Sequence, residues 1–153
     1  MDAIDRRIIL ALQQDGRLSN VDLAVRVGLS PSPCLRRVKL LEERGIITGY
    51  QAVIDRHAIN LSLTVFVEIT VARHSRQNAA LVGQSLSSIP GLVACHMVSG
   101  DADFLAEIVV ADLSSYERLL TEHILTIEAV EQIRSNFSLR PITTSLPLTL
   151  PSA

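Results

Sequence analysis

Residues 28–47 read G-L-S-P-S-P-C-L-R-R-V-K-L-L-E-E-R-G-I-I and carry the strongest structural signals in the sequence. Ser30 is a favourable N-cap, and Pro31 stands at the first helical position, where its missing N–H costs no hydrogen bond. Apolar residues then recur at helical spacing until Gly45, a typical helix stop. The stretch therefore predicts a helix that ends near Arg44. Its inward-facing residues are expected to be Leu35, Val38 and Leu41.

Two shorter helical patterns precede this stretch. Asp2 and Asp5 resemble a capping box, and the apolar spacing that follows them continues to Gly16. Ser19 is the expected N-cap of the next segment, which ends at Gly28. Because a tight turn containing glycine joins the last two helices, we predict a helix-turn-helix.

A short β element is expected after the third helix. Residues 46–54 combine β-branched residues with an alternating pattern. The first domain, residues 1–50, is therefore predicted to be a winged helix-turn-helix. Residues 51–61 are expected to hold a β element and the linker.

The second half of the chain alternates strand-like and helix-like patterns. Strand patterns lie at 63–72, 93–98, 104–110 and 130–139, and helical patterns at 77–88 and from Ser114 to Ile124. The order βαββαβ predicts a ferredoxin-like α+β sandwich over residues 62–153, with both helices on one face of the sheet. Since the other face would be exposed in a monomer, we expect the chain to form a homodimer through it.

Composition and charge narrow the class of protein. Of 153 residues, 48% are hydrophobic and 20% charged, which suits a globular chain with a packed core. The most apolar runs fall short of the roughly 20 residues that a membrane span needs, so we predict no membrane segment. The start of the chain does not follow a signal-peptide pattern, which predicts a cytoplasmic protein. Residues 1–50 hold eight Lys and Arg against six Asp and Glu, whereas the rest holds six against ten. This asymmetry suits an N-terminal nucleic-acid-binding module.

Metal and enzyme chemistry lack their usual sequence signatures. Cys34 and Cys95 lie far apart and predict no disulfide framework. Motifs for acyl, dinucleotide and phosphate chemistry are missing, so we predict no cofactor and no enzyme activity. No metal site is predicted either, because metal-ligand spacing is missing among the four histidines, His57, His74, His96 and His123.

The outward face of the third helix carries the candidate DNA contacts. Arg36 and Arg37 are expected to reach guanine edges or phosphates in the major groove. Ser30 and Ser32 at the helix start would hold a phosphate with the help of the helix dipole. The alternative is an ordinary solvated helix face. The predicted DNA-binding residues are Ser30, Ser32, Pro33, Arg36, Arg37 and Lys39.

The turn S-G-D-A-D at residues 99–103 is the second candidate site. Its residue types suit a plain hairpin turn. They also suit a ligand site, because free backbone N–H groups bind a carboxylate and an aspartate accepts from an ammonium group.

The chain resembles the Lrp/AsnC family of transcriptional regulators. The resemblance rests on residues 28–47 and on D-R-R-I-I-L-A-L-Q-Q-D-G-R at 5–17, M-V-S-G-D-A-D-F at 97–104 and T-T-S-L-P-L at 143–148. It implies a sequence-specific DNA-binding regulator whose assembly or DNA binding is modulated by a free amino acid. It also implies a homodimer that assembles into a higher oligomer, an octamer. The effector-binding residues that it implies are Ser99, Gly100, Asp101, Asp103, Leu125, Asn136 and Ser138.

Two other functions fit the same architecture. One is an enzyme similar to sirohaem decarboxylases, which would hold a tetrapyrrole. The other is an architectural DNA-binding protein without an effector. The sequence departs from the family pattern at Asn60, at Ala102 and at Glu128-Ala129. The last two departures border the expected effector pocket, so the resemblance does not define which amino acid binds there.

Overall fold

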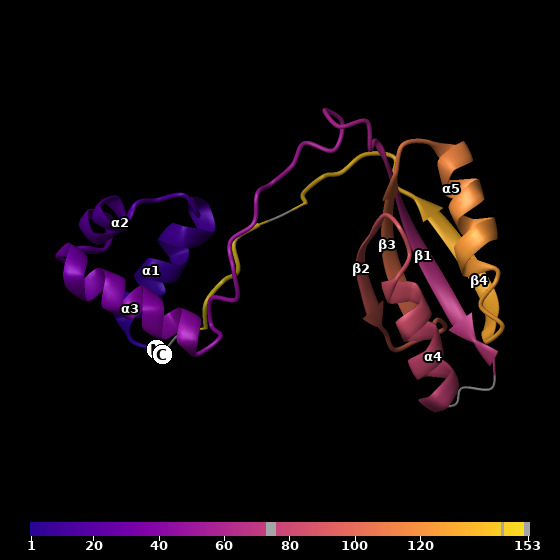
Figure 1. Cartoon of the computed structure of the whole chain (residues 1–153), viewed down its shortest axis with the longest axis horizontal. Helices are drawn as coiled ribbons and strands as arrows, with labels where there is room; N and C mark the ends of the chain where they lie inside the picture. Colours follow the sequence, from indigo (N-terminus) through magenta and orange to yellow (C-terminus); the bar gives the residue numbers. More distant parts are fainter. Residues whose placement is uncertain (73–75, 145, 152–153) are drawn as a thin grey trace. The chain divides into compact units, whose positions relative to one another are not determined.

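The computed structural model describes residues 1–72, 76–144 and 146–151 (Figure 1). The chain divides into two compact units. One holds Met1–Val53 with the described residues from Ile142 onward, and the other is Ile54–Pro141. The expected second domain, 62–153, included the C-terminal tail, which instead groups with the N-terminal helices.

The N-terminal unit is a helix-turn-helix built on the predicted caps. Asp2 and Asp5 form the capping box, and the Ser19 side chain accepts from the backbone of the next helix. Gly28 ends that helix in a left-handed conformation with φ of 69°. The helices are α1 (Ala3–Gln14), α2 (Asn20–Val27) and α3 (Pro31–Glu43).

The buried stripe of α3 differs from the predicted one. Cys34 and Leu41 are buried and Val38 is half-buried, whereas Leu35 is 44% exposed. Residues 34, 38 and 41 follow the i, i+4, i+7 spacing of one helix face, and Leu35 lies a further 100° around the axis. The prediction that Leu35 faces inward is therefore wrong, and Cys34 takes that place.

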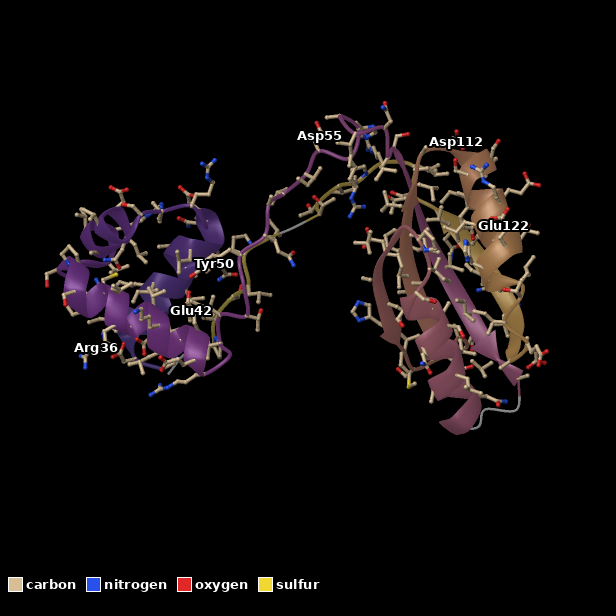
Figure 2. All side chains as sticks on the ribbon, in the orientation of Figure 1. Arg36, Glu42, Tyr50, Asp55, Asp112 and Glu122 are labelled. Carbon is tan, nitrogen blue, oxygen red and sulfur yellow. The ribbon has the colours of Figure 1, made fainter. Side chains whose placement is uncertain are left out.

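Residues 46–54 form no strand in the described part of the chain, contrary to the expected β element. The N–H groups of Ile46 and Ile47 donate instead to the Leu41 carbonyl, at 2.9 and 3.1 Å, and so close the end of α3. The Tyr50 hydroxyl donates to Glu42 at 3.0 Å (Figure 2). The N–H groups of Ile46 and Ile47 thus bond to a carbonyl in the last turn of α3 and are not paired in a sheet ladder.

The C-terminal tail is tied to α1 by a side-chain amide. Gln13 Nε2 donates to the Leu148 carbonyl at 3.2 Å, and the Leu148 N–H donates to Gln13 Oε1 at 2.5 Å. Arg6 also donates to the Pro151 carbonyl. These bonds explain why the tail belongs to the helical unit.

The second unit has the predicted βαββαβ order. Its neighbouring strands are antiparallel, in the sheet order β2-β3-β1-β4. The second helix starts one residue before the expected Ser114, because Asp112 is its N-cap and accepts from the Ser115 N–H at 2.7 Å. The elements are β1 (Leu63–Val71), α4 (Arg76–Ser87), β2 (Leu92–Met97), β3 (Phe104–Val110), α5 (Leu113–Leu119), a π-helical turn (Leu120–Ile124) and β4 (Val130–Phe137).

Both helices pack on one face of the sheet, as predicted. Val65, Val67 and Ile69 of β1 are fully buried and pack in one core with Leu86 of α4 and Leu119 of α5. The opposite face, which we call the open face, carries both apolar and polar side chains. It carries Phe66, Glu68 and Thr70 on β1, opposite Asn136, Arg134 and Gln132 of β4.

No helix in the described residues is both long and apolar enough to cross a membrane.

Candidate functional site

The outward face of α3 presents a set of exposed polar groups. Ser30, Ser32, Arg36 and Lys39 are exposed, and Pro33 is half-buried. Figure 2 shows Arg36 projecting outward from the helix. Such a face, one helix wide, matches the width of a DNA major groove.

The start of α3 offers fewer backbone donors than expected. Pro31 and Pro33 have no N–H. The Cys34 N–H donates to the Ser30 carbonyl at 3.2 Å. The Ser30 side chain makes no capping hydrogen bond. A phosphate at this end would therefore be held chiefly by the hydroxyls of Ser30 and Ser32 and by the Ser32 N–H.

Arg37 lies on a different side of α3 from Arg36. Its Nη1 is 2.6 Å from Asp2 Oδ2 and 2.7 Å from Asp5 Oδ1. The hydrogen bonds that Arg37 donates to the Asp5 and Asp2 carboxylates raise the pKa of Arg37 above its ordinary value. The pKa of Asp2 is lowered, first by the Asp5 N–H and then by Arg37. The structure thus places Arg37 against α1, apart from the exposed face, and its predicted DNA contact stays a prediction.

The turn at residues 99–103 is bonded to the end of β1. The Asp103 N–H donates to the Ile69 carbonyl at 3.0 Å, and Asp103 Oδ2 accepts from the Val71 N–H at 2.8 Å. Ser99, Gly100 and Asp101 are exposed. The Asp103 carboxylate therefore has a structural role in the turn whatever else it binds.

The other predicted effector residues lie apart from this turn within one chain. The Ser138 N–H donates to the Thr64 carbonyl, at the opposite end of β1 from Thr70, which is a separation of about 20 Å along a strand. Asn136 lies on the open face and donates to Glu68 at 3.0 Å. Leu125 is 61% exposed after the π-helical turn. One chain thus does not gather the predicted set into one site.

Sequence reasoning missed the residues that do adjoin the turn. A small hollow of about 30 Å³ is lined by Asp101 and Ala102 together with Glu68, Thr70, Gln132 and Arg134. Arg134 pairs with Glu68 at 3.3 Å. The strand patterns alone do not give the register that brings β4 beside this turn. The signal was the two-residue spacing of Gln132, Arg134 and Asn136, which places these polar side chains on one face of the strand.

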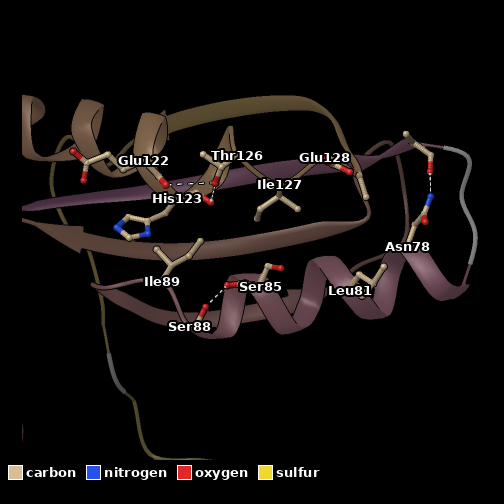
Figure 3. Close-up of a pocket in the computed structure, with 12 residues that line it drawn as sticks. Asn78, Leu81, Ser85, Ser88, Ile89, Glu122, His123, Thr126, Ile127 and Glu128 are labelled. Atoms are coloured by element: carbon tan, nitrogen blue, oxygen red, sulfur yellow. Dashed lines mark hydrogen bonds between the residues drawn. The ribbon is translucent and has the colours of Figure 1, made fainter.

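A larger groove of about 660 Å³ lies between α4 and the π-helical turn (Figure 3). One side of the groove is bordered by Leu81, Ser85 and Ser88, and the other side by His123 and Thr126. Glu128 and Ala129, which depart from the family pattern, also line it. No sequence motif predicted this groove.

The described residues contain no group of three or more His, Cys, Asp or Glu that could hold a metal ion. His74, one of the four histidines considered above, lies outside the described residues. Cys34 and Cys95 are free thiols, and burial raises the pKa of both. A raised pKa favours the protonated, less reactive form.

A three-helix DNA-binding unit followed by a βαββαβ ligand-binding unit defines a class of effector-responsive transcriptional regulators. The Winged helix-turn-helix DNA-binding model matches residues 1–48, and the Lrp/AsnC ligand binding domain model matches residues 64–148. The chain belongs to the Lrp/AsnC family.

Relatives support the same assignment. The leucine-responsive regulatory proteins of Escherichia coli K12 and Klebsiella pneumoniae are each 44% identical over 135 residues, covering 88% of this chain and 82% of theirs. A Neisseria meningitidis transcriptional regulator solved as a complex with L-Met is 32% identical, with a TM-score of 0.92 and coverage of 97% and 96%. An AsnC family regulator from Agrobacterium tumefaciens is 36% identical, also with a TM-score of 0.92, and each chain is covered to 97%.

Proposed function

We propose that this regulator contacts DNA through the exposed face of α3 and that a free amino acid, bound at the 99–103 turn, modulates its assembly or its DNA binding. One observation supports this proposal above all: a DNA-binding family model matches the helix-turn-helix, and a ligand-binding family model matches the unit that contains the sheet. The leading DNA contacts are Arg36, Lys39 and Ser32, whose side chains are exposed on one helix.

The exposed half of the turn has the chemistry that a zwitterionic amino acid needs. Its carboxylate requires hydrogen-bond donors, which the backbone around Ser99 and Gly100 offers in a turn with φ of 121° at Gly100. Its ammonium group requires an anion, which the exposed Asp101 supplies. Asp103 contributes a second carboxylate, one oxygen of which already accepts from Val71. The names of two relatives mention leucine and L-Met, so apolar amino acids are the ligands to test first.

Assembly is the second half of the proposal. We propose a homodimer formed through the open face and a higher oligomer, an octamer, built from such dimers. The open face supports this with Phe66, which is partly exposed beside the Glu68–Arg134 ion pair. An effector can change assembly only by binding one assembly more tightly than another. On this proposal the protein acts on DNA in the cytoplasm, without a cofactor and without enzyme activity.

A screen of the twenty amino acids tests the proposal. The melting temperature of the full chain is measured with each amino acid, and sedimentation reports its size in parallel. A ligand that binds only the folded state raises the melting temperature. We expect at least one amino acid to raise it and to shift the size distribution, and we expect Asp101→Asn to weaken both responses. A set of twenty amino acids that changes neither quantity at millimolar concentration would contradict the effector half of the proposal.

A further inference from the structure

An ion-pair cluster joins the first helix to the recognition helix α3. A single guanidinium nitrogen of Arg37 lies 2.6 Å from Asp2 and 2.7 Å from Asp5. Asp5 is 9% exposed, and it is the one buried charged residue in the described part of the chain. A charged group this buried normally has a specific partner, and Arg37 is that partner.

Each carboxylate in the cluster is held from two sides. Asp2 uses Oδ1 to accept from the backbone N–H groups of Ile4 and Asp5, at 2.9 and 2.8 Å, and Oδ2 to accept from Arg37. Asp5 uses Oδ2 to accept from the Asp2 N–H at 3.0 Å and Oδ1 to accept from Arg37. Both carboxylates are thereby fixed to the first turn of α1, so the position of Arg37 is fixed to α1 as well.

The rest of the contact between α1 and α3 is apolar. Ile8 and Ala11 of α1 share a core with Cys34 and Leu41 of α3. Apolar packing is non-directional, whereas a charged hydrogen bond has a preferred geometry. Arg36 and Arg37 are consecutive, so they lie about 100° apart around the helix axis. A rotation of α3 that moved Arg37 away from the two carboxylates would also turn Arg36.

We infer that Arg37 is a positioning residue for DNA recognition, which locks the rotation of α3 against Asp2 and Asp5 so that Arg36 and Lys39 face the DNA. The inference rests on the proposed DNA contact of the α3 face. In this role Arg37 acts through its neighbours and does not touch the DNA.

The positioning role predicts an effect of Asp5→Asn on DNA affinity that is opposite in sign to the effect expected from charge alone. Removing a negative charge from a DNA-binding unit reduces repulsion of the phosphates, and by charge alone it strengthens DNA binding. If Asp5 positions Arg37, neutralising Asp5 weakens specific binding instead. The sign of the Asp5→Asn effect therefore separates the two accounts.

The experiment uses the full chain and two duplexes, one selected by the wild-type protein from a random-sequence pool and one of scrambled sequence. Affinities for both are measured over a range of salt concentrations, well below the melting temperature of each variant. The variants are Arg37→Gln, Asp5→Asn, their double variant and Arg36→Gln, with Arg118→Gln on α5 as the control.

We expect Arg37→Gln and Asp5→Asn each to lower affinity for the selected duplex about tenfold and to leave the salt slope unchanged. The double variant should be no weaker than Arg37→Gln, because Arg37→Gln already removes the contact that Asp5→Asn weakens. Arg36→Gln should lower the salt slope by about one if Arg36 contacts a phosphate, or lower the preference for the selected duplex if it contacts a base. Arg118→Gln should match the wild type.

Two results would overturn the inference. One is an Asp5→Asn protein that binds the selected duplex as tightly as the wild type or more tightly. The other is an Arg37→Gln protein whose salt slope falls by about one, which would make Arg37 a phosphate contact. An Arg36→Gln protein indistinguishable from wild type would instead contradict the proposed DNA face.

Arg37→Lys keeps the experiment decisive if Asp5→Asn fails to fold. Lysine retains the charge, but its ammonium nitrogen is one bond nearer the backbone than Nη1 of Arg37 and lacks the fixed planar direction of the guanidinium N–H groups, so we expect it not to hold both carboxylates in the same geometry. We expect Arg37→Lys to bind the selected duplex less tightly than wild type while its binding to the scrambled duplex is unchanged. Full retention of selected-duplex affinity by Arg37→Lys would contradict the positioning role.

Discussion

The two units of this regulator hold their candidate functional residues in place by different means. In the helical unit, seven buried hydrophobic residues form the core among the described residues, and a charged cluster links α3 to α1. In the sheet unit, fourteen such residues form the core, and backbone hydrogen bonds tie the 99–103 turn to β1. In the helical unit, with its small core, polar side chains contribute more to the orientation of α3. In the sheet unit, backbone hydrogen bonds between strands fix the position of the 99–103 turn.

The largest effect is expected from a cavity in the larger core. Ile69 is fully buried in the middle strand pair of the sheet. We expect Ile69→Ala to lower the free energy of unfolding of the sheet unit by about 2–5 kcal/mol, from lost burial and the cavity left behind. Urea denaturation followed by circular dichroism measures it. Val93→Ala, at a site 53% exposed, is the control and should cost much less. Equal effects of the two substitutions would contradict this description of the core.

The second prediction concerns the stability of the sheet unit and rests on the close approach of Gly91 to the backbone of Val109. Gly91 has φ of 78°, and a Cβ built on it would lie 2.6 Å from the Val109 carbonyl oxygen. We expect Gly91→Ala to destabilise the protein by about 1–3 kcal/mol, because neither backbone segment can move aside easily.

The matched control for Gly91 lies in the helical unit. Gly45 has a similar φ of 66°, but a Cβ there would meet nothing within 4 Å. Gly45→Ala should show only the cost of the left-handed conformation, about 1–2 kcal/mol at most. Thermal denaturation of both variants gives the comparison. A Gly45→Ala protein less stable than the Gly91→Ala protein would show that contact with Val109 does not matter.

The smallest expected effect is on pH dependence. The pKa of Asp2 is lowered from its ordinary value of 3.8 by the Asp5 N–H and by Arg37. An aspartate with a lowered pKa stabilises the folded state above its ordinary pKa, and this stabilisation is lost as the pH falls through the lowered value. We therefore expect no change from this group between neutral pH and about pH 5, and a loss below the ordinary value of 3.8.

Arg37→Gln tests how much Arg37 contributes to this dependence of stability on pH. It removes one cause of the lowered pKa of Asp2, so the variant should lose less stability than the wild type on acidification. Asp112 provides an internal reference, because its pKa is lowered by Ser115 in the other unit and the substitution does not touch it. Identical acid-unfolding curves for wild type and Arg37→Gln would show that the contact with Arg37 contributes nothing measurable.

Most elements of the fold were predictable because their ends carry strong local signals. The Asp2 and Ser19 caps, Pro31 and the glycine stops gave the three helices, and the alternation in residues 63–72 gave β1. The prediction that Leu35 is buried was wrong because a helical stripe read from the sequence can be displaced by one residue. Cys34, a small apolar side chain, occupies the place instead.

The candidate site was less predictable because it depends on partners distant in sequence. Arg37 and Arg36 look equivalent as neighbouring cations, and only the packing of α3 on α1 separates them. Likewise the register of β4 on β1 places Gln132 opposite Thr70 and leaves Ser138 at the far end of the strand. Neither helical periodicity nor strand alternation contains that long-range information.

The hydrogen bonds between Gln13 and Leu148 have a practical consequence for spectroscopy. The described residues between 142 and 151 belong to the helical unit, although they follow the sheet unit in sequence. A fluorophore attached at the exposed Thr149 would therefore report on the environment of α1. A probe intended to follow amino-acid binding belongs within residues 54–141, for example at the exposed Val93 on β2.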